Sequence, residues 1–317
     1  MNILVILLFI LLFLLLLVLV GSFICYRMAF YVDRKKLAKH DGELTIPPGK
    51  IYEPHRDRMI AWMKEARELP HTDFSITSFD GLKLCGKYYE YAPGAPIEIM
   101  MHGYRGTAER DLCGGIQRCF SIGRSALIID QRGSGKSEGH VITFGIKEYR
   151  DCLAWVDFAV SHFGSDAKLL LTGISMGAST VMIAGSQELP PNVIGIVADC
   201  GYSSAKAIIK KVIRQMKLPA DLLYPFVRLR AKLYGRFDPE EISPVEALKN
   251  CRIPICIVHG EDDNFVPCEM SRENYEACAS QKILFTVPGA GHGLGYLIDP
   301  EGYKKALMES YAQMDTK

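Results

Sequence analysis

The sequence predicts an α/β fold in which helices cover both faces of a mostly parallel sheet. From residue 97 onwards, short apolar runs alternate with helical segments, and such runs are typical of strands that are buried on both faces. Before them, residues 74–79 and 82–91 alternate about an Asp-Gly turn, which predicts a hairpin and antiparallel strands at one edge. A third observation that predicts this fold is a strand-turn-helix pattern around Ser175.

The other elements follow in chain order. Residues 36–52 are polar and contain Pro-Pro-Gly, which predicts a linker. Residues 53–68 are expected to form a helix that Pro70 ends. Further strands are expected at 97–101, 126–129, 169–172, 193–198, 253–259 and 283–287, and further helices at 147–160, 180–184 and 300–312.

The segment between Asp199 and Pro254 is longer than one crossover helix requires, at about 55 residues. We expect it to be helical and to form a small cap at about 201–250, over the carboxyl ends of the strands. From Gly201 to Phe237 it carries nine basic residues and one acid, Asp221. Its apolar residues recur at helical spacing, which predicts either a lid over an acyl chain or a surface on anionic headgroups. An ordinary solvated helix face remains the alternative.

Residues 3–24 are almost entirely Leu, Ile, Val and Phe without a charge, long enough to cross a bilayer as a helix. The alternative is a cleaved signal peptide, but the run is longer than its usual apolar region and no basic segment precedes it. We therefore expect an uncleaved anchor over 1–26, a linker with a helix over 27–70 and a catalytic domain over 71–317. The basic residues after the span are Arg27, Arg34, Lys35, Lys36 and Lys39. They predict a cytoplasmic catalytic domain.

Composition excludes several function classes. The net charge of +1 gives no reason to expect a nucleic-acid partner. The ten cysteines are scattered without a Cys-x-x-Cys pair and no Asn-x-Ser/Thr sequence occurs, which favours a reducing compartment over a disulfide framework. No metal-binding spacing is present. Gly135-Lys136-Ser137 resembles the end of a phosphate-binding loop, but Asp130 occupies the position of the required glycine. No cofactor or metal is therefore expected, and Asp130 and Arg132 are interpreted as braces of their loop.

The motif with the clearest chemistry is Gly173-Ile174-Ser175-Met176-Gly177, which follows the apolar run 169–172. A strand that turns sharply into a helix presents a serine hydroxyl at the top of a sheet, and the turn requires small neighbours. Ser175 is therefore the expected nucleophile.

A serine nucleophile needs a base and an acid that orients the base. His292 lies between glycines just after the predicted strand 283–287, and Asp263 lies just after the strand 253–259. Asp262 is the adjacent alternative acid and Glu261 a less favoured one. His259 ends a strand and is expected to be structural.

Acyl transfer also needs donors for the developing oxyanion. The backbone N–H of Met176, directly after the nucleophile, is the first expected donor. The second is expected in the loop His102-Gly103-Tyr104, after the strand 97–101, at the N–H of Tyr104.

Together these segments resemble the α/β-hydrolase superfamily. The resemblance rests on His-Gly-Tyr-Arg-Gly at 102–106, Asp-Gln-Arg-Gly-Ser-Gly-Lys-Ser at 130–137, Gly-Ile-Ser-Met-Gly at 173–177, His-Gly-Glu-Asp-Asp-Asn-Phe-Val-Pro at 259–267 and Gly-His-Gly at 291–293. Within the superfamily, residues 72–317 are similar to the esterase and serine-aminopeptidase-like branch that includes cinnamoyl esterases. The resemblance implies an eight-stranded α/β-hydrolase core with a triad of Ser175, Asp263 and His292.

The sequence therefore predicts a membrane-anchored serine hydrolase that cleaves small-molecule carboxylic esters through an acyl-enzyme. A serine aminopeptidase is the second hypothesis, but it needs an acidic site for the substrate amine, and the expected cap is basic. A non-catalytic α/β-hydrolase scaffold is the third, although such proteins usually lose a triad member and none is lost here.

Overall fold

An eight-stranded sheet lies at the centre of the structure, a computed structural model that describes residues 3–35 and 42–314. The strand order is β1-β2-β4-β3-β5-β6-β7-β8. The strands are β1 (Thr72–Thr77), β2 (Lys83–Tyr89), β3 (Ile97–Met101), β4 (Ser125–Asp130), β5 (Leu169–Ile174), β6 (Val193–Asp199), β7 (Ile255–Gly260) and β8 (Lys282–Val287). The predicted eight-stranded sheet is confirmed.

The sheet is parallel except at one edge. β2 pairs antiparallel with both β1 and β4, whereas every pair from β4 through β3 to β8 is parallel. The hairpin therefore supplies the antiparallel edge, as its Asp-Gly turn predicts. In the register between β3 and β5, Met101 lies opposite Gly173. This register brings the loops after β3 and β5 together at the carboxyl edge of the sheet.

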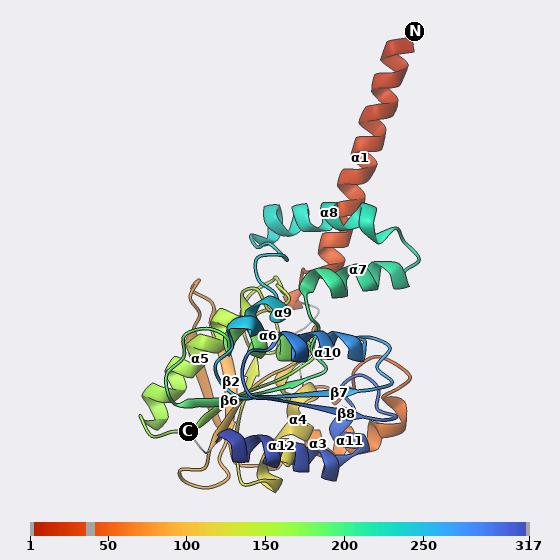
Figure 1. Cartoon of the computed structure of the whole chain (residues 1–317). Coiled ribbons are helices and arrows are strands. Elements are labelled where there is room, and N and C mark those ends of the chain that lie inside the picture. The colour runs from red at the N-terminus through yellow and green to blue at the C-terminus, as the bar shows by residue number, and fades with distance from the viewer. Residues whose placement is uncertain (1–2, 36–41, 315–317) are drawn as a thin grey trace.

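Helices cover both faces of the sheet (Figure 1). One layer contains α5 (Glu148–Phe163), α6 (Met176–Ala184), α9 (Pro244–Ala247) and α10 (Cys268–Ala277), and the other contains α3 (Arg56–Glu68), α4 (Ala108–Ser121), α11 (Gly295–Ile298) and α12 (Pro300–Met314). A short 3-10 helix, η1 (Glu53–His55), precedes α3. The expected helix over 53–68 is thus a 3-10 turn that continues as an α-helix.

The apolar core lies between the sheet and these layers. Every residue of α6 is buried, as expected for a helix whose sequence is apolar or small on all sides. Trp155 of α5 is fully buried against Leu84, Ile99 and Leu171 of the sheet. Short apolar strands are thus covered on both faces, which is why they carry no alternating polar residues.

The inserted segment, residues 201–250 between β6 and β7, is helical as expected. It contains α7 (Ala205–Gln215), α8 (Ala220–Arg230), the π-helical turn η2 (Ala231–Gly235), α9 and the 3-10 turn η3 (Leu248–Asn250). α7 lies nearer to the sheet, and α8 lies beyond it (Figure 1). Ile209 of α7 and Val227 of α8 are buried in one cluster.

The N-terminal helix α1 (Ile3–Ala29) is long and apolar enough to cross a membrane. Residues 3–21 are exposed and project away from the rest of the protein (Figure 1). The end of the helix is embedded instead, because Tyr26 and the following Phe30 are buried against the inserted segment. Two residues of the basic cluster predicted after the span, Lys36 and Lys39, lie outside the described residues.

Candidate active site

Ser175 occupies a strained turn between β5 and α6. Its backbone has φ 56° and ψ −116°, a region that residues with a side chain rarely adopt. A Cβ at Gly173 would lie 2.2 Å from the backbone of Gly177, and a Cβ at Gly177 would lie 2.0 Å from the carbonyl oxygen of Met101. Both positions therefore require glycine, which explains the spacing in the sequence.

The structure brings Ser175, His292 and Asp263 together in one hydrogen-bonded chain. His292 Nε2 lies 2.9 Å from Ser175 Oγ, and His292 Nδ1 lies 2.6 Å from Asp263 Oδ2. Ser175 and Asp263 are buried, and the His292 side chain is 12% exposed. The three side chains come from the loops after β5, β7 and β8. Loops at the carboxyl ends of neighbouring strands converge in this way in open α/β sheets.

The Asp263 carboxylate is held in its ionised form. Burial opposes its ionisation, but hydrogen bonds with His259 and His292 keep the pKa of Asp263 well below its usual value. Its Oδ1 also accepts the N–H groups of Phe265 and Val266, each at 2.8 Å. A carboxylate with this many donors is a strong acceptor for an imidazole N–H.

The two alternative acids face other groups. Glu261 is exposed and accepts a hydrogen bond from the Thr286 hydroxyl at 2.7 Å. Asp262 is also exposed, and its backbone N–H donates to the carbonyl of Ala290. The geometry therefore favours Asp263 over both neighbours as the partner of His292.

Two contacts with the hydrogen-bonded residues Ser175, His292 and Asp263 are not predicted from the sequence. His259 is fully buried, with Nε2 3.2 Å from Asp263 Oδ2 and 2.8 Å from the carbonyl of Val266. Both neighbours are acceptors, so Nε2 carries the proton and Nδ1 accepts from the Ser271 hydroxyl at 2.6 Å. Tyr52, from the predicted linker, donates its hydroxyl proton to the carbonyl of His292 at 3.0 Å. The predicted position of His259 at the end of a strand could have indicated this contact, whereas nothing in the sequence marks Tyr52.

The loop after β3 lies beside the serine turn. A Cβ built on Gly103 would lie 3.6 Å from Ser175 Cβ. The Gly103 N–H donates to Asp111 Oδ2 at 3.1 Å, which fixes the loop. Within the described part of the chain, neither the Tyr104 N–H nor the Met176 N–H makes a hydrogen bond outside regular elements. Met176 directly follows Ser175 in the chain, and Tyr104 directly follows Gly103 in the loop that lies beside Ser175.

Asp130 and Arg132 brace the following loop, as expected. Asp130 accepts the N–H groups of Ala108 and Lys136 on its two oxygens. Arg132 forms two hydrogen bonds of 2.6 Å with Asp151. Both side chains are therefore fully used in holding backbone and helix positions.

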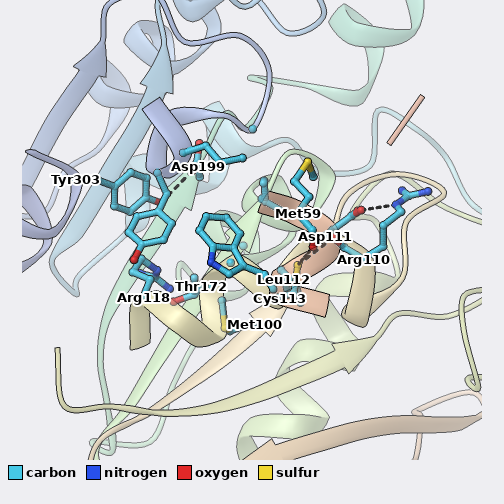
Figure 2. Close-up of a pocket in the computed structure, with 18 residues that line it drawn as sticks. Met59, Met100, Arg110, Asp111, Leu112, Cys113, Arg118, Thr172, Asp199 and Tyr303 are labelled. Carbon is cyan, nitrogen blue, oxygen red and sulfur yellow. Dashed lines mark hydrogen bonds and ion pairs between the residues drawn. The ribbon is translucent and has the colours of Figure 1, made fainter. Parts of the chain in front are cut away.

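A cavity of about 80 Å³ is lined in part by Ile174, the residue before Ser175. Figure 2 shows the residues that line this cavity. Its wall includes Ile174 and Gly293 of the turn region, together with Asp199, whose carboxylate accepts the Tyr303 hydroxyl at 2.9 Å. Burial raises the pKa of Asp199 above its ordinary value. Sites for drug-sized ligands occupy about 300–1,000 Å³, so this cavity is too small to hold a substrate of that size.

One group of side chains has the types and spacing of metal ligands. The ligand atoms of Cys200, Asp263 and His292 lie within 4.8 Å of one another. Burial, however, raises the pKa of the Cys200 thiol well above its ordinary value, and a thiol binds metal only as the thiolate. Asp263 and His292 are already hydrogen-bonded to each other. The chemistry of this group therefore fits proton transfer better than metal binding.

Comparison with known proteins agrees with the fold. Residues 99–231 match the model of the alpha/beta hydrolase fold family. The protein YqkD of Bacillus subtilis, which is uncharacterized, is 24% identical over 62% of this chain, and the match spans 65% of YqkD, just under two thirds.

Solved structures of esterases are similar over more of the chain. A structure of a Pyrococcus furiosus esterase has a TM-score of 0.63 and 25% identity, covering 85% of this chain and 99% of that one. Est1E of Butyrivibrio proteoclasticus, solved with ferulic acid bound, has a TM-score of 0.59 and 23% identity, covering 77% and 100%. The sheet topology, the family model and the solved structures together show that the chain has an α/β-hydrolase fold and that it resembles esterases.

Proposed function

We propose that this protein is a serine hydrolase that cleaves carboxylic esters through an acyl-enzyme formed on Ser175. The observation that carries the proposal is the hydrogen-bonded chain from Ser175 through His292 to Asp263. The similarity to esterases supports an ester as the substrate class.

The geometry supports the following sequence of steps. His292 Nε2 removes the proton from Ser175 Oγ as that oxygen attacks the ester carbonyl. Asp263 accepts the Nδ1–H, which leaves Nε2 free to act as the base and stabilises the imidazolium that forms. His292 then protonates the departing alcohol, and a water molecule activated by the same histidine releases the acid from Ser175.

The negative charge that develops on the carbonyl oxygen needs donors that are already in place. We assign this role to the backbone N–H groups of Tyr104 and Met176. Loss of one such donor typically costs about 3 kcal/mol of transition-state stabilisation. Gly103 supports the assignment because it lies beside Ser175 and is held there by Asp111.

We further propose that residues 1–26 anchor the protein in a membrane, with 27–70 as a linker and helix and 71–317 as the hydrolase domain. In this division the inserted segment is the cap. The length and apolar composition of α1 support the anchor, and the charge asymmetry about it favours a cytoplasmic domain.

The aminopeptidase alternative is not favoured by the charges of the inserted segment. Such an enzyme needs a free carboxylate for the amine of its substrate. The acids of residues 201–250 are all in ion pairs, namely Asp221 with Lys210, Asp238 with Arg228, Glu240 with Lys206, Glu241 with Arg150 and Glu246 with Lys249.

Labelling with a fluorophosphonate probe tests the proposed nucleophile. The parent chain should be labelled, Ser175→Ala should not, and Ser186→Ala should be labelled as the parent is, because Ser186 lies at the far end of α6 and bonds to Met182. Undiminished labelling of Ser175→Ala would overturn the assignment. A panel of esters with varied acyl and alcohol parts then defines the substrate.

A further inference from the structure

We propose that the outer face of α8 and η2 rests on the lipid bilayer that α1 enters. The inference rests on the proposed membrane anchor and adds a second contact with the same membrane. We define the outer face by Leu222, Phe226, Leu229 and Leu233.

These four residues form one apolar stripe, in which the three leucines are exposed and Phe226 is half-buried. They recur at intervals of three or four residues, which places them on one side of a helix. Leu222 is 65% exposed, Leu229 49% and Leu233 60%. The opposite side of the same helix is already buried in the protein through residues such as Tyr224 and Val227. The three leucines are therefore not needed for packing, and exposed apolar side chains gathered on one face are typical of a contact site.

The contacts between α8 and α1 set the height of the stripe relative to a membrane. Arg230, at the end of α8, donates to Ser22 Oγ at 2.9 Å and to the Leu19 carbonyl at 3.2 Å. The rise of about 1.5 Å per helical residue puts Leu19 and Ser22 roughly 24–29 Å along α1 from Ile3. The hydrocarbon core of a bilayer is about 30 Å thick. A bilayer that takes up the exposed part of α1 therefore ends at the level of α8.

The arrangement of the elements agrees with this height. α8 crosses α1 at the C-terminal end of the exposed part of α1, whereas α7 and the sheet lie farther from that part (Figure 1). Tyr234 of η2 packs on Phe23 of α1 with ring centroids 5.4 Å apart. Aromatic side chains are enriched at the boundary between hydrocarbon and headgroups. This packing places an aromatic pair at the expected boundary.

The charges of the inserted segment are partly paired within the protein. Five of the nine basic residues counted in the sequence form ion pairs in the structure, and these pairs involve three acids. Ion pairs join Lys206 to Glu240, Lys210 and Arg214 to Asp221, and Arg228 and Lys232 to Asp238. Asp238 and Glu240 lie just beyond the stretch in which one acid was counted. The contact proposed here is made by the exposed leucines, and salt screens interactions between charges rather than the burial of apolar side chains.

Tryptophan substitution in the full-length chain tests the proposal. The probes are Leu222→Trp and Leu233→Trp, each reconstituted into vesicles of lipids with brominated acyl chains, which quench tryptophan within the hydrocarbon. Met308→Trp is the matched control, because Met308 is 59% exposed on α12, far from α1. Leu12→Trp reports whether α1 itself is inserted. The native Trp62 and Trp155 are buried, and the unsubstituted chain measures their background.

We expect Leu222→Trp and Leu233→Trp to lose fluorescence in the brominated vesicles, as Leu12→Trp does, and Met308→Trp to lose none. The loss should persist in high salt. If Leu12→Trp is quenched and the two stripe probes behave like Met308→Trp, the docking surface is wrong although the anchor holds. If Leu12→Trp is not quenched either, the anchor and the docking surface are both wrong. Fluorophosphonate labelling of the same samples reports separately on the proposed hydrolase function.

Discussion

The hydroxyl of Tyr104 donates a 2.7 Å hydrogen bond to the carbonyl of Ala29, the last residue of α1. Arg105 extends the contact by donating to the carbonyls of Met28 and Tyr31. The last carbonyls of a helix have no partner within it, so these two side chains complete the end of α1. The loop that carries a proposed oxyanion donor is therefore fixed to the end of the proposed anchor.

The first prediction tests this connection. Tyr104→Phe keeps the backbone N–H and the ring but removes the bond to Ala29 and the hydroxyl that accepts from Arg105 Nε at 2.8 Å. A hydrogen bond of this kind is worth about 0.5–1.5 kcal/mol. If it positions the loop for catalysis, the variant should have a kcat up to about tenfold lower, with little change in KM. Steady-state kinetics on the full-length protein measure the effect. Tyr91→Phe, at an exposed position, is the control, and equal rates for both variants would show that the contact is only structural.

The second prediction concerns the choice of acid. Asp263→Asn should lower kcat by about 10⁴-fold, because the amide no longer holds the imidazole in the reactive tautomer. Asp262→Asn should leave kcat nearly unchanged, since Asp262 is exposed and His292 Nδ1 bonds to Asp263 instead. Both variants are measured on one ester under saturating conditions. The reverse order of effects would move the acid by one residue.

The third prediction is a pH profile. The pKa of Asp263 is held below its usual value, so its carboxylate loses its charge only when the pH falls well into the acid range. Any fall of kcat/KM near neutral pH must then come from protonation of the base. Histidine side chains in general titrate at about pH 6.5. We expect kcat/KM to rise through about pH 6 to 8 and then to level off. A flat profile from about pH 5 to 9, with chemistry shown to limit the rate, would argue against a histidine base.

The fourth prediction gives His259 a positioning role through Asp263. His259→Ala removes an N–H donor from a buried carboxylate, and hydrogen bonds to charged groups are worth about 1.5–3 kcal/mol. We expect kcat to fall about 10- to 100-fold. We also expect a shift in the pH at which kcat/KM falls on the acid side of its profile. His259→Gln, which keeps an N–H donor, should recover part of both effects. If both variants lose stability alike and keep the parent profile, His259 is a packing residue only.

The fold was largely predictable because its signals are local. Short apolar runs fixed the parallel strands, and the Asp-Gly turn fixed the antiparallel edge. The steric demand at Gly173 and Gly177 also appears directly in the sequence, since a Cβ at either position would collide with backbone. These features depend on a few neighbouring residues and need no knowledge of distant contacts.

The remaining contacts could not be predicted because they join distant parts of the chain. Tyr52 reaches His292 across 240 positions, and Arg230 reaches Ser22 across 208. No pattern within either segment marks its partner. The pairing of charges in the inserted segment could not be predicted either, since Asp238, which pairs with Arg228 and Lys232, lies just outside the basic stretch. Counting charges by sequence window does not reveal which of them pair.

The last prediction is that α1 stays on the mature protein and that the hydrolase domain faces the cytoplasm. Cleavage after about residue 25, as for a signal peptide, would remove the acceptors that Leu19 and Ser22 offer to Arg230, a buried guanidinium. Of the hydrogen bonds of Arg230 only the one to the Tyr234 hydroxyl, at 3.3 Å, would remain. The loss of hydrogen bonds to a charged group is costly, so the folded protein favours an intact helix. The basic residues in the last turn of α1 and after it, Arg27, Arg34 and Lys35 among them, favour the cytoplasmic side.

Two measurements check this topology. The intact mass of the protein purified from membranes should include residues 1–26. Protease added to whole cells should leave the hydrolase domain uncut, and the same protease should digest it once the cells are opened, which shows that the domain is cleavable. Digestion in whole cells would reverse the orientation, because the enzyme then reaches the domain from outside. A mature chain that begins after about residue 25 would instead replace the anchor with a signal peptide, and Arg230 would then need other partners in the folded protein.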